Sequence, residues 1–136
     1  MARQRPNAPK KRGSRRGRAP AKKPVAAYYM QPGKRGSVVV LHRPVGNRAS
    51  PKVCGVMPSR AHANTLMDQL LRAEAALQDL FYEATDDGIE ALEAVLLATC
   101  TSVLERMPPA EGTLTAGEMA GERDCIQREL DAKAPT

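Results

Sequence analysis

Every acidic residue of this chain follows position 67, so the first half of the sequence carries only positive charge. Residues 1–67 contain 16 Lys and Arg and no Asp or Glu, whereas residues 68–136 contain 5 Lys and Arg and 15 Asp and Glu. The net charge of +6 hides this division. A chain divided in this way typically combines a basic arm that contacts a polyanion with a separately folded part.

Residues 1–36 are predicted to form a disordered basic arm. Their basic side chains alternate with Pro, Gly, Ala and Ser, and such a segment buries too little apolar surface to offset its conformational entropy. The prolines also oppose the amphipathic helix of a mitochondrial transit peptide. The residues expected to contact phosphates are Lys10, Lys11, Arg12, Arg15, Arg16, Arg18, Lys22, Lys23, Lys34 and Arg35.

Two adjacent tyrosines, Tyr28 and Tyr29, follow the basic clusters. Aromatic rings beside cations can stack on unpaired bases, so both tyrosines are candidate contacts to nucleic acid. The alternative is that one ring anchors the arm to the folded part. Neighbouring residues of an extended segment point in opposite directions, so both roles can coexist.

Residues 37–58 favour a short β-hairpin or linker. Residues 37–42 are rich in β-branched side chains, which is typical of a strand, and residues 52–57 are a weaker second strand. The link between them contains Pro and Gly, which favour turns. Because a two-stranded hairpin is marginal alone, it is expected to pack on helices, to join another sheet, or to form on binding.

Residues 59–136 are predicted to form an acidic helical domain with two to three amphipathic helices, which makes the fold mainly α. The first helix is expected to begin near Ser59 or at Asn64–Thr65, and the second near Thr85. Pro108–Pro109 ends the second helix.

A shorter third helix has the clearest start signal of the chain. Thr115 and Glu118 match a capping box, and Leu114 and Met119 match a hydrophobic staple. This helix has few large apolar residues, so it is expected to dock weakly or to fray.

The apolar stripes of the first two helices are too wide for a two-helix hairpin to cover. This favours self-association, most simply two helical hairpins in a dimeric four-helix bundle. The alternative is that the third helix and the β-hairpin cover the stripes within one chain. The residues predicted to mediate oligomerisation are Leu66, Leu70, Leu77, Phe81, Leu92, Leu96 and Val103.

No catalytic motif is recognisable, so the chain is not expected to be an enzyme, and neither a cofactor nor a metal is predicted. Cys54, Cys100 and Cys125 are odd in number and widely spaced, which argues against a disulfide framework. It favours an intracellular, reducing compartment, either the cytoplasm or, in a eukaryotic host, the nucleus or nucleolus. No apolar run approaches the roughly 20 residues of a membrane span, so no membrane partner is expected.

The sequence therefore predicts an accessory or packaging protein that binds nucleic acid and self-associates. Arg43, Arg48 and Lys52 of the hairpin are expected to add phosphate contacts. RNA is favoured over DNA because no basic recognition helix is visible. One alternative is a regulator or inhibitor whose acidic helices bind a protein partner. Another is a viral, nucleocapsid-like structural subunit.

Overall fold

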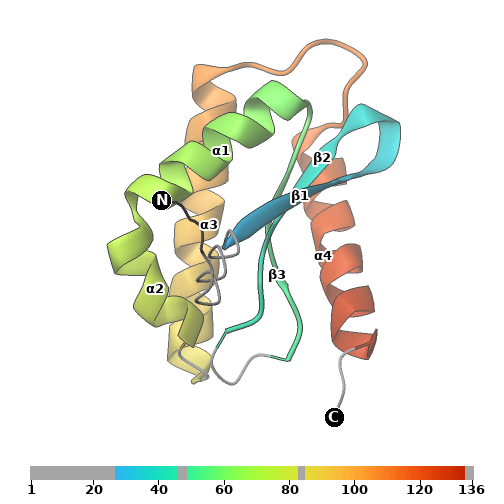
Figure 1. Cartoon of the computed structure of the whole chain (residues 1–136). Helices are drawn as coiled ribbons and strands as arrows, with labels where there is room; N and C mark the ends of the chain where they lie inside the picture. Colours follow the sequence, from blue (N-terminus) through green and yellow to red (C-terminus); the bar gives the residue numbers. More distant parts are fainter. Residues whose placement is uncertain (1–26, 46–48, 83–84, 134–136) are drawn as a thin grey trace, which may run out of the picture.

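The computed structural model describes residues 27–45, 49–82 and 85–133, and it is mainly helical with one small antiparallel sheet (Figure 1). None of the helices in these three ranges is long and apolar enough to cross a lipid bilayer. The strands are β1 (Tyr28–Pro32), β2 (Val38–His42) and β3 (Lys52–Met57), with a short 3-10 helix at Lys34–Gly36. The helices are α1 (Arg60–Arg72), α2 (Glu74–Tyr82), α3 (Asp86–Arg106) and α4 (Ala116–Lys133).

The sheet contains one strand more than the sequence predicted. The predicted hairpin of β2 and β3 is confirmed, with Val38 opposite Met57 and a register shift between Val40 and Leu41. The placement of residues 28–36 in a disordered arm was wrong, because β1 pairs with β2 along its whole length, from Tyr28 opposite His42 to Pro32 opposite Val38. The third strand removes the instability of a lone hairpin. The disorder predicted for residues 1–26 lies outside the described ranges.

Helices cover both faces of the sheet. In Figure 1, α1, α2 and α3 stand on one side and α4 stands on the other. Successive strand residues point to opposite faces, so Val40 packs under α1 to α3 while Val39 and Leu41 pack toward α4. All six residues of β3 are buried, as expected of a strand covered on both faces.

The local signals for helix starts are confirmed by hydrogen bonds. The Ser59 side chain accepts a bond from the His62 backbone N–H and caps α1, so the alternative start at Asn64–Thr65 was wrong. The Thr85 hydroxyl likewise accepts from the Gly88 backbone N–H at 3.1 Å. These caps satisfy amide groups that have no partner within the helix.

The predicted first helix is in fact two helices. A turn at Ala73, with φ −97° and ψ 12°, separates α1 from α2. Its backbone N–H is shared between the carbonyl oxygens of Gln69 and Leu70. The break lets α2 change direction, and both helices then pack against α3.

The last helix is longer and more firmly docked than predicted. The capping box is present, with the Glu118 N–H donating to Thr115 Oγ1 at 3.1 Å and the Thr115 N–H donating to Glu118 Oε1 at 2.9 Å. Its Gln127 side chain binds the outer edge of β3: Oε1 accepts from the Val53 N–H and Nε2 donates to the Pro51 carbonyl. The expectation of weak docking was wrong, because the few apolar side chains of α4 pack against one face of the sheet.

The residues predicted to mediate oligomerisation lie in the core of a single chain. Each has 2% or less of its surface exposed, and all seven belong to one cluster beneath α1, α2 and α3: Leu66, Leu70, Leu77, Phe81, Leu92, Leu96 and Val103. The sheet covers their stripe, which confirms one part of the alternative expectation, whereas α4, which that expectation also named, packs on the other face of the sheet. A dimer through these side chains would have to open the core, so self-association stays a prediction that needs another surface.

Candidate nucleic-acid interface

Only four of the residues of the predicted arm, residues 1–36, that were expected to contact nucleic acid fall within the described structure. Tyr28 and Tyr29 lie in β1, while Lys34 and Arg35 lie in the turn that follows it. The other predicted contacts of the arm lie outside the described residues: Lys10, Lys11, Arg12, Arg15, Arg16, Arg18, Lys22 and Lys23. We refer to residues 1–26, which precede the described structure, as the basic segment.

The two tyrosines point to opposite faces of the sheet. Tyr28 is 3% exposed and joins the core beneath α1 to α3, so it anchors the chain where the basic segment ends. Tyr29 is half-buried, and the Arg43 guanidinium carbon lies 4.6 Å from its ring centroid, a cation–π contact. The Arg43 backbone N–H also donates to the Ala27 carbonyl at 3.0 Å.

The turn between β1 and β2 is held against α4 by carboxylates. The Lys34 backbone N–H donates to Glu122 at 2.9 Å, and the Arg35 guanidinium pairs with Glu118 at 3.0 Å. The pKa of Glu118 lies below its usual value, first because the Thr115 backbone N–H bonds the carboxylate and then because Arg35 is near. Arg35 already has an acidic partner, so a phosphate would have to compete with Glu118 for its guanidinium group.

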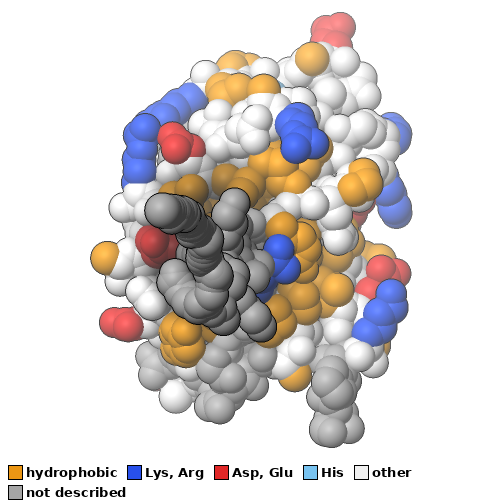
Figure 2. Space-filling model, in the orientation of Figure 1, with side chains coloured by type: hydrophobic (Ala, Val, Ile, Leu, Met, Phe, Trp, Pro, Cys, Tyr) orange, Lys and Arg blue, Asp and Glu red, His pale blue; other side chains and the backbone are white. Residues whose placement is uncertain are grey.

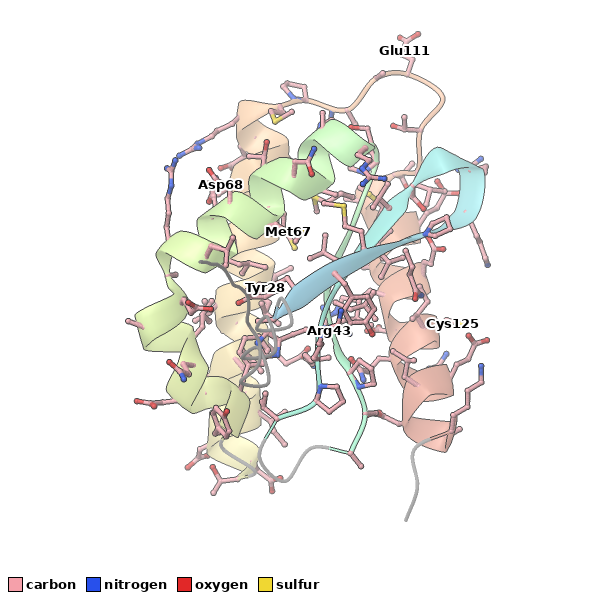
Figure 3. The ribbon with its side chains drawn as sticks, in the orientation of Figure 1. Tyr28, Arg43, Met67, Asp68, Glu111 and Cys125 are labelled. Carbon is pink, nitrogen blue, oxygen red and sulfur yellow. The ribbon has the colours of Figure 1, made fainter. Side chains whose placement is uncertain are left out.

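A groove of about 870 Å³ lies between β1 and α1. Strand β1 and its turn form one wall, and Arg60, Asn64 and Met67 of α1 form the other. All lining residues precede position 68, so the groove contains no acidic side chain. Figure 3 shows Met67 reaching from α1 toward the sheet, and Figure 2 shows hydrophobic side chains gathered across the same face. We call this the acid-free groove.

Arg60 and Lys52, two cations from the first 67 residues, have contrasting surroundings. Arg60 is exposed at the rim of the acid-free groove, and no described acidic residue forms an ion pair with it. Lys52 is only 6% exposed and pairs with Glu93, which also binds Arg123 of α4. The prediction that Lys52 contacts phosphate was therefore wrong, because its ammonium group links β3 to the helices. Arg48 lies outside the described residues.

A second hollow, of about 200 Å³, opens where the basic segment joins β1. Its floor is aromatic: the His42 ring stacks on Phe81 with 3.6 Å between centroids, and the Tyr28 ring meets His42 edge-on at 4.8 Å. Its rim carries polar and exposed side chains of α2. We call this the ring pocket, and it is lined by Ala27, Tyr28, His42, Val45, Glu74, Gln78, Phe81 and Tyr82.

The Tyr28 hydroxyl in this pocket stays protonated at neutral pH. Burial raises its pKa well above the usual value, and electrostatic interactions with Cys54 and with the Glu74 carboxylate raise it further. Sequence reasoning found Tyr28 but not the pocket, because the lining comes from two strands and from α2, which pairing and packing bring together.

Residues 27–45, 49–82 and 85–133 contain no group of three or more His, Cys, Asp or Glu side chains placed to hold a metal ion. Cys54, Cys100 and Cys125 are free thiols.

Comparison of this chain with models of protein families, with curated proteins and with solved structures gave no match.

Proposed function

We propose that this chain is a non-enzymatic accessory or packaging protein that binds nucleic acid, RNA in preference to DNA. One observation carries the proposal: the basic segment holds ten Lys and Arg and no acidic residue. It joins the folded body directly at β1, beside an acid-free groove. Lys and Arg that neutralise phosphates release condensed counterions, which supplies affinity without reading sequence.

The net charge of the described residues also supports binding through the basic segment. The described residues carry 10 Lys and Arg against 14 Asp and Glu, so the body itself repels a polyanion. Binding is therefore expected to depend on the basic segment, with Arg60 and the acid-free groove as the adjoining surface. This arrangement directs a nucleic-acid strand to one face of the molecule.

The preference for RNA follows from the shape of the basic surface. Helix α1, beside the acid-free groove, has Arg60 and Arg72 at its two ends, whereas a helix that reads the DNA major groove needs several residues aimed at bases. A groove beside an edge strand, with half-buried Met30 and Met67 among its lining residues, suits unpaired nucleotides whose bases can splay out.

A salt titration tests this function. The full chain is titrated against single-stranded RNA, duplex RNA and duplex DNA, beside a variant with Lys10, Lys11, Arg12, Arg15, Arg16, Arg18, Lys22 and Lys23 changed to Gln. If about eight phosphates are engaged, log K on duplex DNA falls with log salt at a slope near −7, and the variant loses most of that slope. A chain with residues 1–26 in shuffled order keeps every charge and is expected to retain binding. Equal binding by the Gln variant, or no binding at low salt, contradicts the proposal.

A second candidate function is a protein-interaction regulator that uses the acidic helices. Helix α3 exposes Leu97 by 61% and Val95 by 37% of their surfaces, with acidic residues nearby in the sequence. The same exposed residues are available for the self-association that remains part of the proposal. If the Gln variant keeps its cellular activity while nucleic-acid binding is lost, this second function is favoured.

A further inference from the structure

The ring pocket has the dimensions of a site for one planar heterocycle. An apolar protein cavity of about 150 Å³ accommodates a benzene ring, and the ring pocket, at about 200 Å³, is larger. Its floor is made of three rings in mutual contact, Tyr28, His42 and Phe81. At its rim, Tyr82 is 51% exposed and offers a further ring for stacking.

Two polar side chains of one helix face line this space. Glu74 and Gln78 are four residues apart in α2, so their side chains lie one above the other. Glu74 and Tyr28 line the same pocket, and the carboxylate helps to raise the pKa of the Tyr28 hydroxyl. The pocket thus combines a carboxylate acceptor, an amide that both donates and accepts, and an O–H donor.

We propose that the ring pocket binds a single unpaired nucleobase, with guanine preferred. The edge of guanine presents two neighbouring N–H donors, on N1 and N2, which match the two oxygens of the Glu74 carboxylate. Adenine presents one amino group beside a ring nitrogen that accepts, so it leaves one carboxylate oxygen without a donor. Unpaired bases are commonly recognised in this way, by stacking on aromatic side chains and by hydrogen bonds to their Watson–Crick edges.

The position of the pocket connects this inference to the proposed function, on which it rests. Ala27, the residue next to the basic segment, lines the pocket, and its carbonyl oxygen bonds the backbone of Arg43. A nucleotide whose base enters the pocket therefore has its phosphates close to the point where ten cations begin. The strand must be unpaired there, because a base within a duplex cannot offer its edge.

Mononucleotides of equal charge test the base preference without relying on the basic segment. The full chain, labelled with 15N, is titrated with GMP, IMP and AMP while backbone amide shifts are recorded. GMP is expected to bind most tightly, IMP more weakly because it lacks the N2 amino group, and AMP most weakly. The shifts should map to Tyr28, His42 and α2. Equal affinities for all three nucleotides, or shifts that leave the residues of the ring pocket unchanged, overturn the proposal.

A matched pair of variants identifies the carboxylate. Glu74→Gln keeps the shape of the side chain but removes its charge, and Asp79→Asn makes the same change on α2 outside the pocket. Because a hydrogen bond to a charged group contributes more than a neutral one, Glu74→Gln should weaken GMP binding roughly 10- to 100-fold. AMP binding should be nearly unchanged, and Asp79→Asn should behave as the unaltered chain. A guanine preference that survives Glu74→Gln contradicts the assignment.

Short RNAs separate the failure of this inference from the failure of the proposed function. Oligouridine with one central G is compared with the same oligomer carrying a central A, across a range of salt. Steep salt dependence without a G preference overturns the base pocket and leaves the nucleic-acid function standing. A GMP preference without salt-dependent RNA binding overturns the proposed function and leaves a mononucleotide site.

Discussion

Gly55 sets how closely α3 and α1 approach the sheet. A Cβ atom added there would lie 2.5 Å from Cys100 Sγ and 3.2 Å from Leu66 Cδ2. The first distance is far below an ordinary van der Waals contact, and both neighbours belong to the packed core. The absence of a side chain is therefore required for packing at this position.

Gly55→Ala is expected to destabilise the fold by about 1–3 kcal/mol, because it overpacks a close contact. The double variant Gly55→Ala/Cys100→Ala should recover part of that loss, since it removes the sulfur that the new methyl group meets. Gly121→Ala is the matched control: nothing lies within 4 Å of its added Cβ, and alanine favours a helix interior, so it should stabilise by up to about 1 kcal/mol. Urea unfolding measures all three, and additive effects of Gly55→Ala and Cys100→Ala would contradict the contact.

Two weakly acidic side chains, the Cys100 thiol and the Tyr28 phenol, make the fold sensitive to alkaline pH. Burial raises the pKa of Cys100 from 9.0 to about 11, and burial also raises the pKa of Tyr28. The unfolded chain releases the Cys100 proton near pH 9 and the Tyr28 proton near pH 10, while the folded chain keeps both. The free energy of unfolding is therefore unaffected by these groups below pH 9 and falls above it, and the Cys100 part of the loss is complete near pH 11.

The expected outcome is a falling free energy of unfolding between pH 9 and 11, with a shallower fall in Cys100→Ala. For Cys100 alone the loss is roughly 2 kcal/mol, because each unit of pKa shift corresponds to about 1.4 kcal/mol. Urea midpoints at pH 7.5 and pH 10.5 provide the measurement. An identical pH dependence in Cys100→Ala and the unaltered chain would show that this thiol titrates normally.

At the scale of elements, the β1–β2 turn and α4 are joined by one buried carboxylate. Glu122 is 8% exposed and accepts hydrogen bonds from the Lys34 N–H and from the Ser37 hydroxyl, at 2.9 and 3.3 Å. Without the carboxylate, a partly buried backbone N–H would have no acceptor. The two elements meet although they lie about 85 residues apart in the sequence.

Glu122→Ala should lower the free energy of unfolding by about 1–3 kcal/mol, the usual result of leaving a buried donor unsatisfied. Glu129→Ala, at an exposed position of the same helix, removes the same charge and should change stability little. Amide hydrogen exchange should also show faster exchange at Lys34 in Glu122→Ala. Unchanged exchange there would mean that the turn does not depend on the Glu122 carboxylate.

Elements with local signals could be predicted from the sequence, and those that depend on distant partners could not. Thr85 and Thr115 could be predicted as helix starts, because each hydroxyl accepts a hydrogen bond from a backbone N–H only three residues away, so the signal is local. Strand β1 has no comparable signal: it follows a basic run, and it becomes a strand only because β2 pairs with it. The break at Ala73 contains neither Gly nor Pro, so nothing in the local sequence marked it.

At the scale of the molecule, the sheet explains why the oligomerisation residues were misassigned. The helices alone leave the apolar stripe of Leu66, Leu92 and Leu96 exposed, and self-association is the simplest way for helices alone to bury it. The sheet supplies that cover within one chain, through residues such as Val40 and Met57. The basic charges of the interface could be predicted from the sequence, whereas the acid-free groove and the ring pocket required the tertiary fold.

Two truncations should therefore behave differently. A chain that starts at residue 27 retains every described element, so it is expected to unfold cooperatively with nearly unchanged stability. A chain that starts at residue 37 lacks β1, leaves the core without the Tyr28 ring and exposes an edge of β2, so it should lose several kcal/mol or fail to fold. Thermal unfolding monitored by circular dichroism compares them, and equal melting temperatures would contradict an integral β1.

The junction between the basic segment and the sheet also has a mechanical consequence. The Ala27 carbonyl is bonded to the Arg43 backbone, and Tyr28 is in register with His42, so the chain is paired with β2 from the first residue that the structure describes. A pulling force applied at Ala27 would therefore act directly on the β1–β2 ladder and on the buried Tyr28 ring. The strand that such a force reaches first is the strand whose side chain anchors the sheet in the core.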